Sequence, residues 1–310
     1  MDAMHKWTDE ELEKLERRLR VHYRKAGVEM EKKLSQHLLQ FNADDKRLAK
    51  LLKQGRIKKK DYIAWRQRQI LLTKSFKEIR DQLAKDYLNV NRQAAEMIGK
   101  KIPEVMSENR NYATYDIEKK SGIDTMFTLT DKDTVDRLIK EQPNLLPHVY
   151  AAKDTAWNRR KITSAVTQGI LQGESMDDVA KRLQRVTEMN RNAAIRNART
   201  AVTGAENAGR ISGFERAENM GIKMLKQWMA THDSRTRHSH RDLDGEEVEV
   251  KEEFGNGLMY PGDPDGDASE TYNCRCALIA QVEGHEIEKD TMVSDDYMDY
   301  EDWKEGLMSL

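Results

Sequence analysis

The sequence has few of the residues that cross-link or interrupt a chain. Its 310 residues include 2 cysteines and 5 prolines, and one residue separates the two cysteines. A Cys-x-Cys ring is short and strained, so this pair cannot serve as a disulfide framework, and we expect the protein to be made in a reducing cytoplasm. Since no run of about 18 apolar residues occurs, the sequence also excludes a transmembrane helix.

Proline is missing from the sequence before Pro103, which allows long helices there. Aromatic residues make up 6% of the chain, hydrophobic residues 38% and charged residues 35%. This balance favours helices with narrow apolar seams over a thick core. A capping box at Thr8 and Glu11 predicts a helix from there to about Phe41, and a second helical run is predicted over residues 61–98. Apolar side chains three, four or seven residues apart line one stripe of the first helix.

Changes in pattern along the chain predict five parts. Residues 1–102 are an N-terminal helical arm, 103–150 an irregular connector with one short helix, and 151–221 a central helical block. Residues 222–283 form a small α+β domain, and residues 284–310 an acidic tail that is either disordered or docked on a basic partner. The predicted fold class is mainly α, with long N-terminal helices and a central helical block followed by a small α+β C-terminal domain.

The last helix of the central block, predicted over residues 188–220, contains the run TAVTGAENAGRISG. Its small side chains would let another backbone approach closely, either at an intersubunit or interdomain contact or through tight packing inside one domain. They are Ala201, Gly204, Ala205, Ala208, Gly209 and Ser212. Alternating side chains from Lys223 to Ala230 then predict a strand, and Asp244-Gly245 predicts a tight turn into another.

Charge is distributed unevenly along the chain. Residues 1–120 hold 29 Lys and Arg against 19 Asp and Glu, while the whole chain has a net charge of -1. The densest basic run consists of Arg56, Lys58, Lys59 and Lys60. It could contact nucleic-acid phosphates or an acidic partner, and a solvated connection between helices is the plainer alternative.

Four short elements follow one another in the C-terminal part. They are Asp-x-Arg-Thr at 233–236, His-x-x-Leu-Asp-Gly at 240–245, Pro-Gly-Asp-Pro at 261–264 and Asn-Cys-Arg-Cys at 273–276. In this order they resemble the C-terminal domain of phage head morphogenesis proteins, the minor head proteins similar to protein F of phage Mu. Including the helix that precedes the motif, the resemblance covers roughly residues 150–280.

This resemblance implies a non-enzymatic structural protein of the virion of a tailed phage. The expected place is the head interior or the portal vertex, after synthesis in the bacterial cytoplasm. The expected partners are the portal protein, other head proteins, copies of the chain itself and packaged DNA. The expected roles are head assembly, DNA packaging or DNA ejection.

The motif contains two alternative sets of side chains that could hold its segments together. Cysteines two residues apart point to one face of an extended chain, so Cys274 and Cys276 could bind a structural zinc with His240 and either His238 or His232. Many relatives carry a different set of cysteines and histidines. The alternative, which we favour from the sequence, is that Arg235 and Arg237 pair with carboxylates of Asp233, Asp244 or Glu270. The structural motif residues expected overall are Asp233, Arg235, Arg237, His240, Asp244, Gly245, Glu270, Asn273, Cys274, Arg275 and Cys276.

Two enzymatic interpretations use the same residues. Asp233, His238, His240 and Asp244 could bind a divalent cation that activates water in a nuclease, and Cys274 could act as a nucleophile with His240 as its base. A virion-carried nuclease or transferase-like effector is therefore one alternative function. A DNA-binding arm formed by the basic N-terminal part is another.

Overall fold

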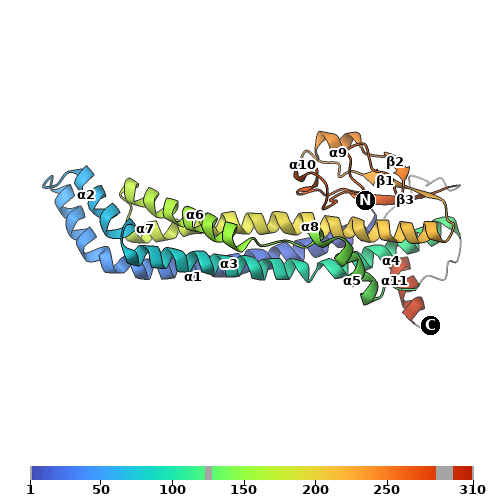
Figure 1. Ribbon diagram of the computed structural model, residues 1–310, viewed down its shortest axis with the longest axis horizontal. Coiled ribbons are helices and arrows are strands. Elements are labelled where there is room, and N and C mark those ends of the chain that lie inside the picture. The colour runs from blue at the N-terminus through green and yellow to red at the C-terminus, as the bar shows by residue number, and fades with distance from the viewer. Residues whose placement is uncertain (1, 123–127, 284–295, 309–310) are drawn as a thin grey trace. The chain divides into compact units, whose positions relative to one another are not determined.

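The computed structural model describes residues 2–122, 128–283 and 296–308 and shows the predicted fold class (Figure 1). Long helices occupy most of the chain, and a small three-stranded sheet lies in its C-terminal part. In order, the elements are α1 (Ala3–Lys53), α2 (Lys59–Arg66), the π-helical turn η1 (Gln67–Leu71), α3 (Lys74–Gly99), α4 (Ile102–Ser121), α5 (Lys132–Glu141), the 3-10 turn η2 (Pro143–Leu145), α6 (Ala151–Gln172), α7 (Met176–Lys181), α8 (Leu183–Asn219), β1 (Met224–Met229), α9 (His238–Asp242), β2 (Glu247–Glu249), α10 (Ala268–Thr271), β3 (Ala277–Val282) and α11 (Asp296–Met308). Among the described residues, no helix is long and apolar enough to cross a membrane.

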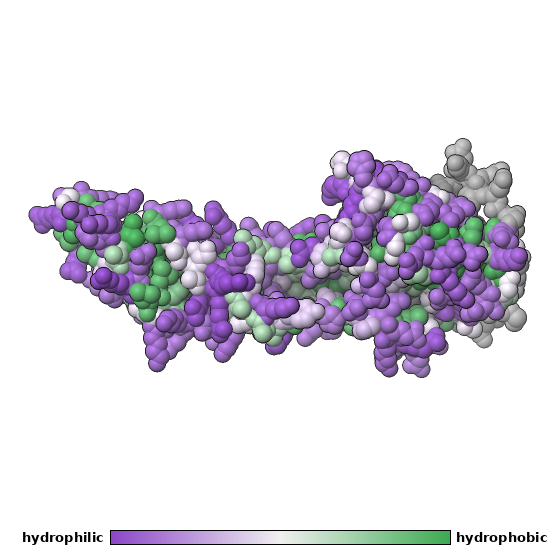
Figure 2. All heavy atoms as spheres, turned by 45° about the horizontal axis from the view of Figure 1, so that its top comes forward, coloured by the Kyte–Doolittle hydropathy of each residue, from purple (hydrophilic) through white to green (hydrophobic). Residues whose placement is uncertain are grey.

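The chain folds into two compact units, each made of segments far apart in the sequence. Unit 1 contains residues 1–16, 96–148 and 195–310, and unit 2 contains residues 17–95 and 149–194. The sequence analysis divided the chain into consecutive stretches instead, and those domain boundaries remain a prediction. The apolar stripe of α1 is confirmed, since Leu12, Leu15, Leu19, Leu34 and Leu38 are all buried. The face drawn in Figure 2 is largely hydrophilic, as the high charge content requires.

The first helix differs from the prediction at both ends. It begins at Ala3 rather than at Thr8, because the carboxylate of Asp2 accepts the backbone N–H of His5 at 2.7 Å and caps the helix. It also continues past Phe41 to Lys53. Asp45, beyond the predicted end of the helix, is buried and binds a side chain of the next helix: Arg66 donates its Nε to Asp45 at 2.7 Å.

The second predicted helix is interrupted. After α2 and the π-helical turn, the chain leaves helical geometry at Leu72 and Thr73, and α3 starts at Lys74. The hydroxyl of Thr73 accepts the backbone N–H of Phe76 at 3.2 Å, so Thr73 caps α3. A side-chain cap is a local alternative to continued helix, which explains the break without a proline or glycine.

Residues 102–121 form helix α4, so the irregular connector predicted from residue 103 was wrong in its first half. Pro103 lies in the first turn, where proline needs no hydrogen-bonded N–H. The polar run that suggested a loop is buried instead. Asn109 is fully buried and donates to the hydroxyl of Thr8 at 2.9 Å. The short helix predicted over 133–142 is confirmed as α5, which Asp131 caps.

The small-residue run of α8 packs tightly inside unit 1. A Cβ at Gly209 would lie 2.4 Å from the carbonyl oxygen of Met106 in α4, and one at Gly204 would lie 2.8 Å from the carbonyl oxygen of Gly262. Two backbones therefore meet this face of α8 at distances that only glycine permits. Of the two interpretations of the run, tight packing within one domain holds at these positions.

The sheet has the strand order β2-β1-β3, with both pairs antiparallel. The predicted alternation is confirmed, because Met224, Lys226 and Trp228 of β1 are buried while the residues between them are partly exposed. Lys226 reaches the carbonyl oxygen of Met259 with its ammonium group at 2.8 Å. The turn predicted at Asp244-Gly245 is confirmed too, since Gly245 has φ 84° and β2 follows it.

Part of the predicted acidic tail is a helix that packs on the same chain. Residues 284–295 lie outside the described residues, but α11 places Tyr300 against Tyr112 and Tyr115 of α4, with ring centroids 5.4 and 5.6 Å apart. Tyr300 also donates its hydroxyl to Glu108 at 2.9 Å. For this segment, then, the aromatic side chains explain docking on unit 1 better than a basic partner does.

Candidate functional site

The four motif elements come together on the half of α8 that belongs to unit 1 (Figure 1). Thr203 of α8 donates its hydroxyl to the carbonyl of Cys274 at 2.8 Å. Asn207, one turn later, donates to the carbonyl of Cys276 at 3.1 Å and accepts the N–H of Leu278 at 2.8 Å. These bonds satisfy backbone groups just before β3 and at its start. They therefore fix the position of both cysteines relative to α8.

Neither Thr203 nor Asn207 was predicted from the sequence as a site residue. Their signal was a polar side chain four residues after another inside a small-residue run, which puts both on one face of a helix. Asn207 also donates to the carbonyl of Pro261 at 3.0 Å. It therefore joins the Pro-Gly-Asp-Pro loop to the Asn-Cys-Arg-Cys segment.

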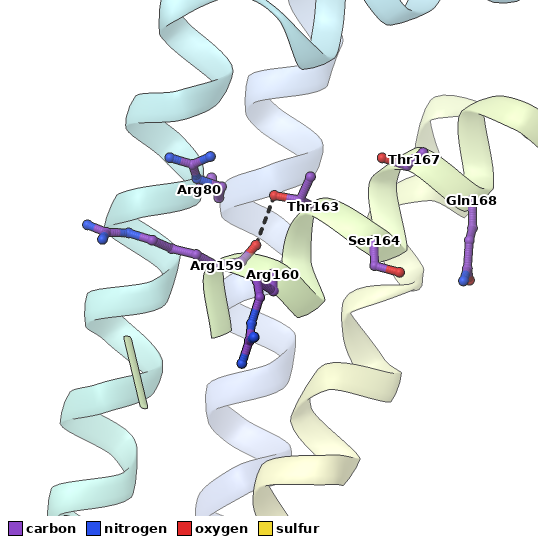
Figure 3. A pocket seen from close by; sticks show the side chains of 7 residues that line it. All are labelled: Arg80, Arg159, Arg160, Thr163, Ser164, Thr167 and Gln168. Carbon is purple, nitrogen blue, oxygen red and sulfur yellow. Dashed lines mark hydrogen bonds between the residues drawn. The ribbon is translucent and has the colours of Figure 1, made fainter. Parts of the chain in front are cut away.

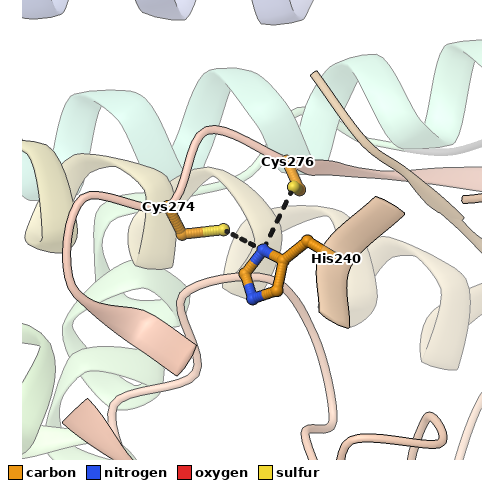
Figure 4. A group of neighbouring side chains, drawn as sticks. All are labelled: His240, Cys274 and Cys276. Atoms are coloured by element: carbon orange, nitrogen blue, oxygen red, sulfur yellow. Dashed lines mark hydrogen bonds between the residues drawn. The ribbon is translucent and has the colours of Figure 1, made fainter. Parts of the chain in front are cut away.

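Cys274, Cys276 and His240 form the centre of the site (Figure 4). The Nδ1 atom of His240 lies 3.6 Å from Sγ of Cys274 and 3.4 Å from Sγ of Cys276. The three donor atoms lie within 4.8 Å of one another, and all three residues are buried. Of the four residues expected as zinc ligands, the structure thus brings together three.

The fourth expected residue, His238, is exposed and lies outside this group. Both histidines belong to α9, and residues two apart on a helix do not face the same side. His232, the other alternative, is exposed and meets Asp244 with its Nε2 at 3.2 Å. Neither histidine completes a set with His240 and the cysteines.

Glu270 holds the other nitrogen of His240. Its Oε2 lies 3.0 Å from His240 Nε2, and the same oxygen accepts the hydroxyl of Ser239 at 2.9 Å. Burial opposes ionisation of this carboxyl, but the hydrogen bond from Ser239 and the charge of His240 outweigh burial and lower the pKa of Glu270. The carboxylate therefore contacts Nε2 of His240, while Nδ1 faces the two sulfurs.

The pKa values of the two thiols are shifted in opposite directions. The hydrogen bond with Cys274, assisted by His240, lowers the pKa of Cys276 well below that of an ordinary thiol although burial opposes this. The same hydrogen bond, together with burial, raises the pKa of Cys274. Because each cysteine is 2% exposed, a substrate cannot reach either sulfur, which argues against Cys274 as a nucleophile.

An arginine-carboxylate pair joins the same chain segments beside the cysteines. Arg275 donates Nη1 and Nη2 to the two oxygens of Asp233 at 2.6 and 2.7 Å, which is the bidentate arrangement. The kind of pair was predicted, but the cross-segment arginine is Arg275 rather than Arg235 or Arg237. Arg275 is extended between two inward-facing cysteines, so its side chain points to the opposite side.

The other predicted pairs differ accordingly. Arg235 lies 3.5 Å from Asp233, two residues away, and therefore joins no distant segment. Arg237 donates to the backbone carbonyl of Tyr272 instead of a carboxylate. Asp244 accepts the backbone N–H of Ala230 at 2.8 Å and fixes the end of β1.

The nuclease constellation is not assembled. Asp233, His238, His240 and Asp244 do not form a metal-sized group in the part of the chain that the structure describes. The hydrogen bonds of Asp233 are used within the fold: Arg235 and Thr236 donate their backbone N–H groups to its Oδ1 at 2.8 and 3.1 Å. These residues build the loop rather than an open cation site.

Asn273 is the residue whose conformation sets up the cysteine segment. It has φ 55°, the one positive value among the described non-glycine residues. We predict that Asn273→Ala lowers the free energy of unfolding by about 1 to 2 kcal/mol, because a β-carbon without a local polar partner is strained in this region. Asn273→Gly is the matched control and should stay near the wild type in urea unfolding. Equal losses for alanine and glycine would contradict the backbone argument.

Unit 2 carries the basic features of the chain. Arg56, Lys58, Lys59 and Lys60 are exposed around the turn between α1 and α2. Elsewhere in this unit, α3 and α6 border a shallow hollow of about 390 Å³ (Figure 3). Its lining consists of Arg80, Arg159, Arg160, Thr163, Ser164, Thr167 and Gln168. Asp81 lies 2.7 Å from Arg80 and 3.0 Å from Arg159 and neutralises part of this charge.

Comparison with known proteins identifies relatives of the chain. It is 31% identical over 199 residues to the NAD(+)-arginine ADP-ribosyltransferase EFV of Enterococcus faecalis. These aligned residues make up 61% of this chain and 40% of that protein. It is 29% identical over 220 residues to the minor head protein GP7 of Bacillus phage SPP1, which covers 69% of each. The uncharacterized protein YqbB of Bacillus subtilis is 29% identical over 129 residues, 39% of this chain and 41% of that protein. No solved structure matches.

The family comparison bears on the motif region itself. Residues 160–279 match the family described as Phage Mu protein F like protein. This range includes most of α6, all of α8 and the four motif elements. The resemblance predicted from the motif is therefore confirmed. Residues 160–279 are thus similar to the Phage Mu protein F-like family, and the chain is similar to a phage minor head protein along 69% of both chains.

Proposed function

We propose that the protein is a structural, non-enzymatic minor head protein of a tailed phage, located in the head interior or at the portal vertex. The observation that carries the proposal is that the motif side chains make their contacts within the fold. Thr203 and Asn207 bind the backbone of the cysteine segment, Asp233 binds Arg275, and the cysteines are buried. Side chains used in this way stabilise the fold of the motif. The similarity to GP7 along 69% of both chains supports the same role.

We further propose that the basic turn of unit 2 contacts an acidic surface of the portal or of another head protein. Lys58, Lys59 and Lys60 are exposed and adjacent, and Arg56 stands two residues before them. Opposite charges on the two surfaces of such a contact raise the rate of association and fix the orientation of the two proteins. Packaged DNA is the alternative partner, because phosphates would select the same side chains.

The experiment replaces three lysines in a phage that encodes the full chain. Lys58→Glu/Lys59→Glu/Lys60→Glu reverses the charge of the turn, and quantitative mass spectrometry counts the copies of the protein in purified proheads. We expect at least a tenfold loss of incorporation. Normal incorporation overturns the assigned contact, and absence of the wild-type protein from proheads and virions overturns the proposed function.

The matched control changes three exposed lysines of α3 in the same unit, as Lys74→Glu/Lys77→Glu/Lys85→Glu. It makes the same change in net charge away from the turn, and we expect incorporation close to the wild-type level. Binding of both variants to duplex DNA at low and high salt separates the two partners. A turn variant that loses salt-sensitive DNA binding but enters proheads normally assigns the turn to DNA.

A further inference from the structure

The two nitrogen-sulfur distances at the cysteine centre match those of a tetrahedral metal site. Zinc bonds to sulfur and nitrogen at the usual lengths place a sulfur and a nitrogen ligand roughly 3.6 Å apart across a tetrahedral edge. The observed separations from Nδ1 of His240 are 3.6 Å to Cys274 and 3.4 Å to Cys276. A position between the three atoms is therefore at bonding distance from all of them with little movement of the side chains.

Hydrogen bonding alone leaves this arrangement incomplete. Nδ1 of an imidazole has one lone pair or one proton in the ring plane, so it makes one good hydrogen bond. Figure 4 shows the thiols of Cys274 and Cys276 both directed at that single atom of His240. A cation between the three atoms binds both sulfurs and the nitrogen together, whereas Nδ1 can make a good hydrogen bond with one sulfur at a time.

The surroundings of His240 are those of a metal-bound imidazole. Its far nitrogen Nε2 lies 3.0 Å from the carboxylate of Glu270, which Ser239 and Asn256 also approach, at 2.9 and 3.5 Å. A carboxylate on the far nitrogen orients a ligating histidine and strengthens its donor atom. The ring also stands edge-on to buried Trp228, with centroids 5.1 Å apart, so its orientation is fixed by packing as well.

We propose that Nδ1 of His240 and the sulfurs of Cys274 and Cys276 bind one zinc ion, with Glu270 as the carboxylate that positions the histidine. Two thiolates and an imidazole form a donor set suited to zinc. The thiol protons leave to solvent as the metal binds. Among the residues that the structure describes, no further Cys, His or carboxylate joins the group, so a water molecule takes the fourth position.

The ion would act as a structural cross-link. It joins α9 to a segment more than thirty residues later, just before β3, next to the Asp233 and Arg275 pair. The zinc ion and the Asp233 and Arg275 pair are compatible, because Arg275 points away from the face that the cysteines share. This inference concerns the fold of the motif, so it stands independently of the proposed place of the protein in the phage head.

The test is metal analysis of the untagged full-length protein, purified without chelators. We expect about one zinc per chain by mass spectrometry of the elements. After removal of zinc and addition of Co²⁺, we expect the absorption bands of cobalt bound to thiolate. Cys274→Ser/Cys276→Ser should lose both signals, and Glu270→Gln should bind zinc roughly 10 to 100 times more weakly.

The control variant is His238→Ala, which removes an exposed histidine from the same helix and should keep the full zinc content. Because the cysteine variant can fail to fold, the wild-type protein is also stripped with a strong chelator. Its thermal midpoint should fall and recover when zinc is added back. Wild-type protein that is folded, contains no zinc and gives no cobalt-thiolate bands overturns the proposal, and so does zinc that persists in the cysteine variant.

Discussion

Arg210→Met is expected to lower the free energy of unfolding by about 3 to 5 kcal/mol, because it leaves the carboxylate of Asp2 without its counter-charge and removes one of the two cations beside buried Glu206. The guanidinium of Arg210 is 3% exposed and lies 3.2 Å from Glu206. It donates Nη2 to Asp2 at 2.9 Å and Nη1 to the carbonyl of Leu278 at 2.8 Å. Burial opposes the ionisation of Asp2, but the charge and hydrogen bonds of Arg210 lower the pKa of Asp2 below its ordinary range. The change is measured by urea unfolding at pH 7.

The matched control is Arg191→Met, which makes the same replacement earlier in α8. The guanidinium of Arg191 contacts its neighbour Asn192 at 3.4 Å, so we expect a change within about 0.5 kcal/mol. The double variant Asp2→Asn/Arg210→Met should recover part of the loss, because it removes the charge that Arg210 leaves unpaired. A loss below about 1 kcal/mol for Arg210→Met, with no recovery in the double variant, would show that the network adds little to stability.

Periodicity predicted the parts of the fold that depend on local pattern. The apolar stripe of α1 and the alternation of β1 follow from the repeat of side-chain direction along a helix and a strand, and both are confirmed. Helix α4 was missed because its polar side chains are buried. Asn109 finds partners in Thr8 of α1 and Arg210 of α8, at 2.9 and 3.1 Å. Partners that are about a hundred residues away cannot be seen in a local pattern.

The sequence predicted which residue types form the site, but it predicted only some of the pairs of residues that contact each other. Cys274, Cys276 and His240 were expected from their chemistry, and the structure brings them together. The selection of His240 over His238 depends on α9, a helix too short to predict from the sequence. The choice of Arg275 as partner of Asp233 likewise depends on which way an extended segment faces. Both selections can be made only when the backbone conformation, and hence the direction of each side chain, is known.

The pH dependence of stability should reveal a second part of the same buried network. Nδ1 of His5 lies 2.7 Å from the carboxylate of Glu206, and both side chains are buried. Burial disfavours the charged imidazole, but Glu206, with smaller effects from Asp9 and Asp2, outweighs it and raises the pKa of His5 to about 9. The folded protein therefore keeps a proton on His5 at pH values where the unfolded chain has lost it.

The sign of the effect follows from linkage. A raised pKa in the folded state adds stability that is complete below the unfolded value of 6.5 and is lost as pH rises through about 9. We expect the stability difference between wild type and His5→Gln to shrink by about 3 kcal/mol between pH 6 and pH 9.5. Taking the difference removes the contribution of Lys226, whose pKa burial lowers to about 8 and which acts with the opposite sign.

Urea unfolding at several pH values measures that difference, and His22→Gln controls for the loss of a ring from the same helix. The second readout is NMR titration of the His5 imidazole, which should have its midpoint near 9. A His5 midpoint near 6.5, together with a stability difference between wild type and His5→Gln that does not change with pH, would contradict the prediction. It would mean that Glu206 pairs with Arg210 and not with a charged His5. A midpoint near 9 with the expected slope assigns Glu206 to both cations, and it makes the N-terminal turn of α1 part of what holds α8 and β3 in place.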